Sequence, residues 1–275
     1  MCAMPIDRRS LLIGSLSGAA ALTLPLSAHG IDAAQFGVRP GAPDDQSRAL
    51  QRAIDQAART RAPLILVPGI YRAGDLKLSD GAQLLGVRGA TRLVLTRGPS
   101  LLSGETGDHI TISGLVFDGG RQPLPQNRGL VHLVASKSIR ISDCEFAGAG
   151  GNAIALERCE GQVIANSITG ATNNAILCND NFGVIISSNI IRDSGNGGIR
   201  VWQSVKRHDG SVVADNTIED TEARAGGTGE NGNAINVFRA ANVIVRNNII
   251  RRAHSPLFEA TRRPIFRSSA TIARH

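Results

Sequence analysis

From about residue 109 onwards, the chain repeats a short pattern in which apolar residues alternate with other residues after a turn rich in glycine and asparagine. The alternating apolar pairs are Val131 and Leu133, Ile154 and Leu156, Ile176 and Cys178, Ile199 and Val201, and Ile235 and Val237. Their starting positions lie 23, 22, 23 and 36 residues apart. This alternation predicts short strands that each bury one face.

A second pattern interleaves with the first and ends each time in Asn-x-Ile. Its copies begin at Asn166, Asn189, Asn216 and Asn248, and an imperfect earlier copy stands at residues 144–146. Each period of about 22 residues therefore holds two short strands and two turns. The strands are too short for a sandwich, and no helix separates them as a parallel βαβ sheet requires. We therefore predict an all-β parallel β-helix, in which each coil stacks on the last.

The repeated asparagines have a structural interpretation. In a stack of coils the same turn recurs at about 4.8 Å, so asparagine amides can bond from one coil to the next. Asparagine also tolerates the left-handed backbone of sharp turns. We expect Asn166, Asn189, Asn216 and Asn248 to form such a ladder rather than to bind a ligand.

A helix is predicted before the repeats. Asp44 and Asp45 precede an amphipathic stripe and are expected to cap a helix that ends before Pro63. Short strands are then expected at 64–67, 70–71, 75–78, 83–87 and 92–96. The stripe consists of Leu50, Ala53, Ile54, Ala57 and Ala58.

Residues 1–30 have the features of an export signal. Arg8 and Arg9 precede an apolar, uncharged stretch at 14–26 that is too short to span a bilayer, so no membrane span is expected after cleavage. The arginine pair resembles the twin-arginine signal, although Asp7, Leu11 and Ile13 replace its usual Ser or Thr, Phe and Lys. We predict passage through the twin-arginine translocation machinery to the periplasm or beyond; an ordinary secretory leader is the alternative.

The segments described so far resemble known proteins. Residues 34–38 (Ala-Gln-Phe-Gly-Val), the Asp44-Asp45 pair, the helix and residues 67–71 (Val-Pro-Gly-Ile-Tyr) are similar to the opening of pectate-lyase-like right-handed β-helix proteins. With its leader, the chain is also similar to a family of twin-arginine-translocated repeat proteins that has no assigned activity. The resemblance covers about 31–253. It implies a right-handed coil whose N-terminal end is closed by the helix, with the cap helix and first coils at 31–108 and the repeats at 109–253.

Composition and charge restrict the classes of function. Hydrophobic residues make up 42% and charged residues 19%, as in a globular protein, and only seven Phe, one Trp and one Tyr accompany 31 Gly. The formal charge of +7 is not spread over the body: residues 1–30 carry +1 and residues 251–275 carry +5, which leaves +1 for 31–250. Because a nucleic-acid-binding face needs a basic stripe, nucleic acid is not an expected partner.

Three cysteines remain once the leader is removed. The spacing of Cys144, Cys159 and Cys178 fits no zinc site. We expect them to be buried free thiols; one disulfide with one thiol left over is the alternative.

The alternation also predicts which side chains face outward from the repeated strands. If Ile154 and Leu156 point inward, two outward columns follow. The first column contains His132, Ala155, Leu177, Arg200 and Asn236, and the second contains Val134, Glu157, Asn179, Trp202 and Phe238. Aromatic rings next to polar groups commonly bind sugars, so this face is a candidate polysaccharide-binding groove. A tryptophan that merely covers a strand end is the alternative.

Unequal spacings favour the groove. The gap from a ladder asparagine to the next strand is usually 10 residues, but it is 19 from Asn216 to Ile235; from Leu115 to Val131 the gap is 16. On the other edge, the gap from Ile199 to Asn216 is 17 residues, where 12–13 is usual. These lengths indicate inserts at 219–231 and 203–210, on opposite edges of the coils that carry Trp202 and Phe238. Insertions in solenoids tend to gather on the binding face, so we expect a walled cleft.

Catalytic candidates are few. Glu157, Asp180 and Arg200 lie near the predicted cleft, and two carboxylates on adjacent coils are what a glycoside hydrolase requires. A salt bridge among Glu157, Arg158 and Asp180 is the structural alternative. His208 and Asp209, on one rim, could act as a base and the residue that orients it. No cofactor is evident, and a calcium site lacks an acidic cluster because each outward column holds at most one acid.

Two functions remain open from sequence. The chain is either an exported polysaccharide lyase, glycoside hydrolase or epimerase, or a non-catalytic β-helix that binds an envelope polysaccharide or another protein. Residues 254–275 lack both repeat patterns, so we expect a poorly packed basic tail and a C-terminal end that is truncated or poorly capped.

Overall fold

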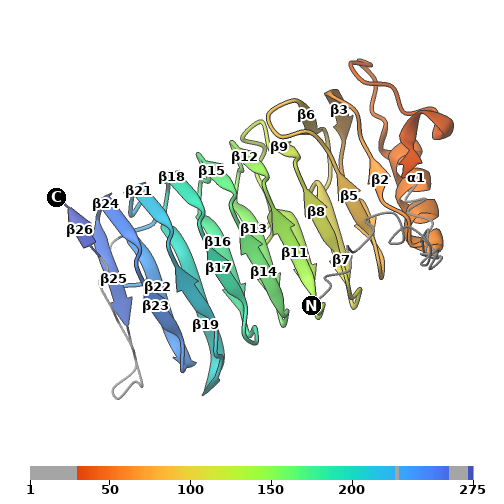
Figure 1. Cartoon of the computed structure of the whole chain (residues 1–275). Coiled ribbons are helices and arrows are strands. Elements are labelled where there is room, and N and C mark those ends of the chain that lie inside the picture. The colour runs from red at the N-terminus through yellow and green to blue at the C-terminus, as the bar shows by residue number, and fades with distance from the viewer. Residues whose placement is uncertain (1–29, 227–228, 260–271, 275) are drawn as a thin grey trace, which may run out of the picture.

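The computed structural model describes residues 30–226, 229–259 and 272–274 (Figure 1). The chain forms a solenoid of stacked coils, in which strands of successive coils pair in parallel and build three long sheets. A single α-helix, α1 (Ser47–Thr60), covers the N-terminal end of the stack in the described part of the chain. The all-β solenoid with one N-terminal cap helix is thus confirmed.

Each complete coil contributes one strand to each sheet, in the order A, B, C along the chain. Sheet A contains β1 (Ile31–Asp32), β2 (Leu64–Ile65), β5 (Gln83–Leu85), β8 (Thr111–Ser113), β11 (Ile139–Ser142), β14 (Gly161–Ile164), β17 (Ile185–Ser187), β20 (Val212–Ala214) and β23 (Ile244–Arg246).

Sheet B follows sheet A after a sharp corner. It contains β3 (Gly69–Ala73), β6 (Thr91–Leu95), β9 (Val116–Asp118), β12 (Glu145–Ala147), β15 (Ser167–Thr169), β18 (Ile190–Ser194), β21 (Thr217–Thr221), β24 (Ile249–Ala253) and β26 (Ile272–Arg274).

Sheet C carries the longest strands. It contains β4 (Leu76–Leu78), β7 (Leu102–Glu105), β10 (Gly129–Val134), β13 (Asn152–Glu157), β16 (Asn174–Asn179), β19 (Gly197–His208), β22 (Asn233–Ala241) and β25 (Ser255–Glu259). A short 3₁₀ helix, η1 (Ala33–Phe36), precedes α1.

The core is a column of inward-facing aliphatic side chains. Successive coils place Ile154, Ile176, Ile199 and Ile235 above one another, all fully buried. Rings enter this column rarely: Phe117 and Phe146 stack with their centroids 4.8 Å apart. The shortage of aromatic residues follows from this geometry, because layers one strand spacing apart leave room for thin side chains.

The start of α1 differs from the prediction. The helix begins at Ser47 with Gln46 at the N-cap position, and Gln46 makes no side-chain capping bond. Its carboxamide instead exchanges hydrogen bonds with the backbone of Arg39, at 2.7 and 2.9 Å. Asp45 still accepts a hydrogen bond from the Ser47 N–H, at 2.9 Å. A tertiary contact has therefore moved the helix start by one residue.

Two predictions fall wholly or partly outside the described residues. The export signal at 1–30 lies there except for Gly30. In the tail, β25 pairs with β22 and β26 pairs with β24, which extends sheets C and B by one strand each. The predicted poor packing of 254–275 concerns residues that are largely outside the described set and stays a prediction.

Candidate functional site

The outer face of sheet C carries a column of side chains that changes at every coil. Val134, Glu157, Asn179, Trp202 and Phe238 pair in register along β10, β13, β16, β19 and β22. All five side chains are partly exposed. The repeat register read from the sequence therefore gives the correct alignment of this column.

The first outward column is not exposed as the alternation alone suggests. His132, Ala155, Leu177, Arg200 and Asn236 retain between 1% and 7% of their exposure. Described residues of the two long connections from sheet B to sheet C, at 119–128, 222–226 and 229–232, lie over this column beside Leu177 and Arg200. The Asn152 amide donates a hydrogen bond to the Arg128 carbonyl at 2.9 Å, and the Asn236 amide donates one to the Glu230 carbonyl at 3.1 Å. These hydrogen bonds hold the two inserts in place.

Two adjoining pockets lie on this face. The first, here called the Phe238 pocket, has a volume of about 390 Å³ and is lined by Asn127, Glu157, Asn179, Asp180, Trp202, Gln203, Ser204, Phe238 and Arg239. The second, the Arg200 pocket, has a volume of about 360 Å³ and is lined by Gln126, Asn127, Asn173, Leu177, Asn179, Asn196, Arg200, Trp202, Ala225, Glu230 and Asn231. Because Asn127, Asn179 and Trp202 line both, the two pockets form one groove.

Trp202 lies where the two pockets meet. Its indole N–H donates to Oδ1 of Asn236 at 2.9 Å, which fixes the ring orientation. The Phe238 ring lies 5.3 Å from it at an angle of 49°. The guanidinium of Arg200 stacks over the ring at 3.7 Å from its centroid. The tryptophan is thus held rigidly while part of its surface remains accessible to a ligand.

Arg200 is a buried cation with one charged partner. Its side chain is 8% exposed, and Nη2 donates to Oε1 of Glu230 at 2.6 Å. Nε has no hydrogen-bond partner among the described residues. Burial lowers the pKa of Arg200, and the hydrogen bond and charge of Glu230 oppose that shift.

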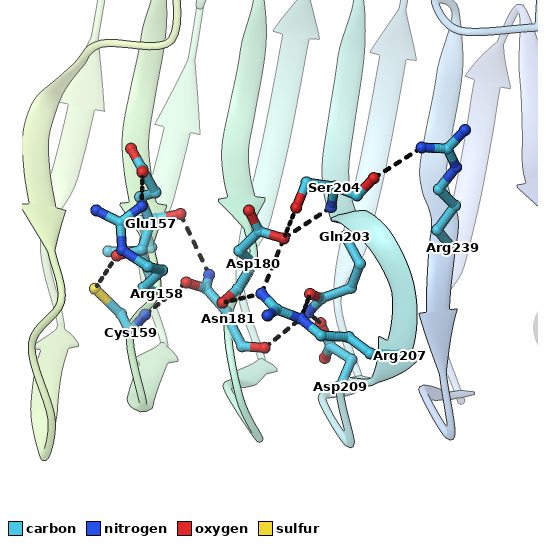
Figure 2. Close-up of polar contacts among 11 residues, drawn as sticks. Glu157, Arg158, Cys159, Asp180, Asn181, Gln203, Ser204, Arg207, Asp209 and Arg239 are labelled. Atoms are coloured by element: carbon cyan, nitrogen blue, oxygen red, sulfur yellow. Dashed lines mark hydrogen bonds and ion pairs between the residues drawn. The ribbon is translucent and has the colours of Figure 1, made fainter.

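Asp180 is held by the insert on the other edge of sheet C (Figure 2). Its Oδ1 accepts hydrogen bonds from the Ser204 N–H and hydroxyl, at 2.7 and 2.9 Å, and forms an ion pair with Arg207 at 3.0 Å. Glu157, its predicted partner, forms an ion pair with Arg158. The two carboxylates therefore line the same pocket but are each engaged by a different arginine.

The insert at 203–210 is a continuation of β19 rather than a separate loop. The register between β19 and β22 shifts between Trp202 and Arg207, so that extra residues bulge outward before pairing resumes at Arg207 and Ala240. Gln203 turns inward and is buried there. A bulge absorbs the additional residues because it lets one strand lengthen while its neighbour stays short.

His208 and Asp209 are not brought together. The imidazole Nδ1 of His208 lies 2.6 Å from the Asn242 amide and is exposed. The carboxylate of Asp209 is buried and accepts a hydrogen bond from Gln203 Nε2 at 2.7 Å (Figure 2). It accepts another from the Ser211 N–H at 2.9 Å. The hypothesis of a base with its orienting acid has no geometric support, because the His208 ring is exposed beside Asn242 while the Asp209 carboxylate is buried against Gln203 and Ser211.

His132 is the second histidine candidate, and it is buried. It is 5% exposed and its Nδ1 has no partner among the described residues. Burial, and next the charge of Arg128, lower its pKa to about 4. The ring is therefore neutral at pH 7, and it lines neither pocket of the groove.

The four repeated asparagines stack at the corner between sheets A and B. The Asn166 amide donates to Oδ1 of Asn189, and Asn189 to that of Asn216, each at 3.0 Å. Asn216 donates in turn to Oδ1 of Asn248 at 2.9 Å. All four are buried. Their hydrogen-bonding capacity is used within the fold.

Several groove residues were missed by sequence reasoning. Among them, Asn127 and Glu230 come from the two long connections between sheets B and C. The inserts were recognisable from their lengths, but which of their side chains turn toward sheet C was not. That choice depends on turn conformations without a repeat to fix their alignment.

The fold defines the class of protein: this is a right-handed parallel β-helix built of three parallel sheets. Solved structures that resemble it include gene product 12 of bacteriophage phi29 (TM-score 0.64, 14% identity, 82% of this chain and 34% of that one). Another is an exopolygalacturonase from Thermotoga maritima (0.58, 12%, 81% and 68%). A third is a mannuronan C-5 epimerase A-module from Azotobacter vinelandii (0.52, 17%, 80% and 71%). The chain thus spans about a third of the phage protein.

A family can also be assigned. The profile described as periplasmic copper-binding protein (NosD) matches residues 75–252, and the chain belongs to this family. No curated protein matches the chain in sequence. The family description names a periplasmic protein, in agreement with the predicted compartment.

The described residues do not fit a copper centre. No three His, Cys, Asp or Glu side chains among them gather as a metal-binding group. Cys144, Cys159 and Cys178 are free and buried, and burial raises the pKa of the Cys144 thiol to about 12, which disfavours the thiolate that a metal needs. Both methionines of the chain, Met1 and Met4, lie outside the described residues.

None of the helices in the described ranges is both long and apolar enough to cross a membrane.

Proposed function

We propose that this protein binds a polysaccharide in the groove on sheet C. The observation that carries the proposal is the arrangement of Trp202 and Phe238 over a run of amide side chains, in two pockets that share Trp202. Sugar rings present apolar faces and hydroxyl edges, which a partly exposed aromatic ring and amides can contact together. An elongated groove of this kind suits a chain of sugars.

The comparisons support a glycan as ligand. The exopolygalacturonase and the mannuronan epimerase share the fold and carry the names of enzymes that act on polysaccharides. At 12% and 17% identity they give the fold, so the choice of ligand depends on the groove itself.

Binding accounts for the groove better than catalysis. Asp180 is engaged by Ser204 and Arg207, and Asp209 is engaged by Gln203 and Ser211. A general acid or base must reach the scissile bond; these contacts hold Asp180 in the wall of the Phe238 pocket, and Asp209 is buried and lines neither pocket. One observation favours hydrolysis as the second candidate: Glu157 and Asp180 line the same pocket.

The test of binding uses the mature chain from about residue 31 and a panel of neutral and uronate polysaccharides in affinity gel electrophoresis. We expect retardation by at least one glycan, and loss of most of it in Trp202→Ala, since stacking contributes about 0.5–1.5 kcal/mol. Phe182→Ala is the control, because Phe182 is an exposed aromatic residue that lines neither pocket. Equal retardation of wild type and Trp202→Ala contradicts the proposal.

The test of hydrolysis follows glycan size by gel filtration, with and without calcium. Shortening that disappears in both Glu157→Gln and Asp180→Asn identifies a depolymerase that uses the pair. Asp180→Asn keeps an oxygen that can accept the Ser204 hydrogen bonds, so its fold is expected to survive. Binding without shortening supports the non-catalytic assignment.

Export is the remaining part of the proposal. We propose that Arg8 and Arg9 direct the chain through the twin-arginine pathway to the periplasm, where the groove meets envelope polysaccharide. Replacing both by lysine is expected to keep the chain in the cytoplasm, as measured by cell fractionation. Unchanged export of this variant indicates an ordinary secretory leader instead.

A further inference from the structure

The two partners of the Arg200–Glu230 ion pair have very different environments. The Arg200 side chain is 8% exposed, whereas that of Glu230 is 56% exposed. A carboxylate that is half in water can leave the pair and be hydrated at little cost. A buried guanidinium left without an anion carries a large penalty, so it requires a replacement. Another anion can therefore take the place of Glu230, whereas Arg200 stays where it is.

Among the described residues that line it, the pocket around Arg200 offers no other anion. Six of its lining residues are asparagine or glutamine, and Arg200 and Glu230 are its charged members. Neutral amides can hydrogen-bond to an incoming group but cannot balance the charge of the guanidinium. When the Glu230 side chain turns away, the pocket holds one uncompensated positive charge surrounded by amides.

Contacts fix the Arg200 guanidinium and the backbone at Glu230, but not the Glu230 side chain. The Arg200 guanidinium is held against the Trp202 ring, 3.7 Å from its centroid. The backbone at Glu230 is anchored by the Asn236 amide, which donates to its carbonyl at 3.1 Å. Exchange of one carboxylate for another at Arg200 therefore needs rotation of one exposed side chain and no rearrangement of the coil.

We propose that Arg200 is the subsite of the groove that recognises a sugar carboxylate, and that Glu230 occupies it until a uronate residue of the polysaccharide takes its place. This rests on the proposed function and deepens it, because it specifies a uronate glycan rather than a neutral one. The planar guanidinium suits a carboxylate, with which it forms paired hydrogen bonds. Trp202 then contacts the ring that carries this carboxylate or its neighbour.

Calorimetric titration tests the subsite with oligogalacturonate and oligomannuronate, each as the free acid and as its methyl ester. We expect Glu230→Gln to raise the affinity for the free acid about three- to tenfold, because the internal competitor is gone. Arg200→Gln is expected to lower it at least about tenfold. The methyl esters should bind weakly to all variants. Opposite effects from the two partners of one ion pair are the signature of competition.

The connection between β21 and β22, which carries Glu230, also supplies a matched control. Glu222 and Arg224 form an exposed ion pair at 2.6 Å, and neither residue lines the groove. Glu222→Gln and Arg224→Gln change the net charge as the test variants do, so they measure any general effect of charge on a polyanion. We expect both to change affinity less than about twofold.

The outcomes are distinct. If Glu230→Gln weakens binding or leaves it unchanged, the ion pair is structural and the subsite is wrong, even where Arg200→Gln fails to fold. Equal affinity for acid and ester also overturns it while leaving glycan binding intact. Absence of binding to every glycan of the panel contradicts the proposed function, and the subsite falls with it.

Discussion

Asparagine serves two different purposes in two regions of this molecule. At the corner between sheets A and B, Asn166, Asn189, Asn216 and Asn248 are buried and bond to one another. In the groove on sheet C, Asn179 is partly exposed and its amide makes no hydrogen bond to another described residue. The asparagine amide is therefore fully hydrogen-bonded at the corner and available to a ligand in the groove.

The difference follows from repetition. A ladder requires the same residue at the same point of every coil, because each amide needs an identical neighbour one strand spacing away. The groove column instead changes at each coil, from Glu157 to Asn179 to Trp202. In a solenoid, repeated outward or corner positions therefore build the stack, and unrepeated ones on a walled face are the candidates for recognition.

The largest expected effect comes from breaking the ladder. In Asn189→Ala, the buried Asn166 N–H and amide lose the Oδ1 they share, and the Val163 carbonyl loses its donor. We expect a loss of about 3–5 kcal/mol in the free energy of unfolding, measured in urea. A loss below about 1 kcal/mol contradicts the assignment of these bonds as structural.

The second effect is a pH dependence of stability caused by His132. Its folded pKa of about 4 lies below its ordinary 6.5, so the folded state binds the proton less readily than the unfolded state. The stabilisation is complete above pH 6.5 and declines as the pH falls toward 4, by roughly 3 kcal/mol in total. Urea unfolding at several pH values measures it, and His132→Gln should flatten the curve between pH 6.5 and 4. An unchanged slope in that variant contradicts the effect.

A smaller loss is expected on sheet B, away from the groove. Glu219 is 8% exposed and accepts hydrogen bonds from Arg251 and Arg192, at 2.5 and 3.1 Å, and these bonds lower its pKa. Glu219→Gln should lower the free energy of unfolding by about 1–2 kcal/mol at pH 7. In the wild type this contribution is complete above pH 4.5 and is lost as the pH falls through the lowered folded pKa. Glycan binding should not change, and a change would show that the sheets are coupled.

The smallest effect sharpens the comparison of the two kinds of asparagine. Asn179→Ala should alter the free energy of unfolding by less than about 0.5 kcal/mol, because the side chain is not bonded within the described fold. The same change should weaken glycan binding about three- to tenfold, through loss of hydrogen bonds to sugar hydroxyls. A stability loss comparable to that of Asn189→Ala would remove the distinction between ladder and groove.

Much of the fold was accessible from the sequence because the repeat aligns the coils. Fixing Ile154 and Ile176 as inward residues places Glu157 beside Asn179 in the observed register. The same reasoning fails where the repeat is interrupted. Arg200 and His132 were expected on an open face, and both are buried. The apolar alternation of a strand does not indicate whether a neighbouring loop covers its outer face.

The pairing of charges was also beyond the sequence. Asp180 is bound by Arg207, at which strand pairing resumes after the bulge in β19, rather than by Arg158 one coil away. Glu230 meets Arg200 across 30 positions of the chain. Such pairs depend on rotamers and turn conformations, which vary independently of the apolar alternation that sets the fold.

The sequence by itself determined the solenoid, the asparagine ladder and the column that contains Glu157, Asn179, Trp202 and Phe238. These features arise because the same apolar alternation recurs in every coil, so that the alignment of one coil predicts the alignment of the next. Only the tertiary structure decided that Arg200 is buried beneath an insert, against Trp202 and opposite Glu230. The physical reason is that burial and ion pairing depend on surfaces brought together from distant segments, and a sequence without a repeat at those segments leaves their contact undetermined.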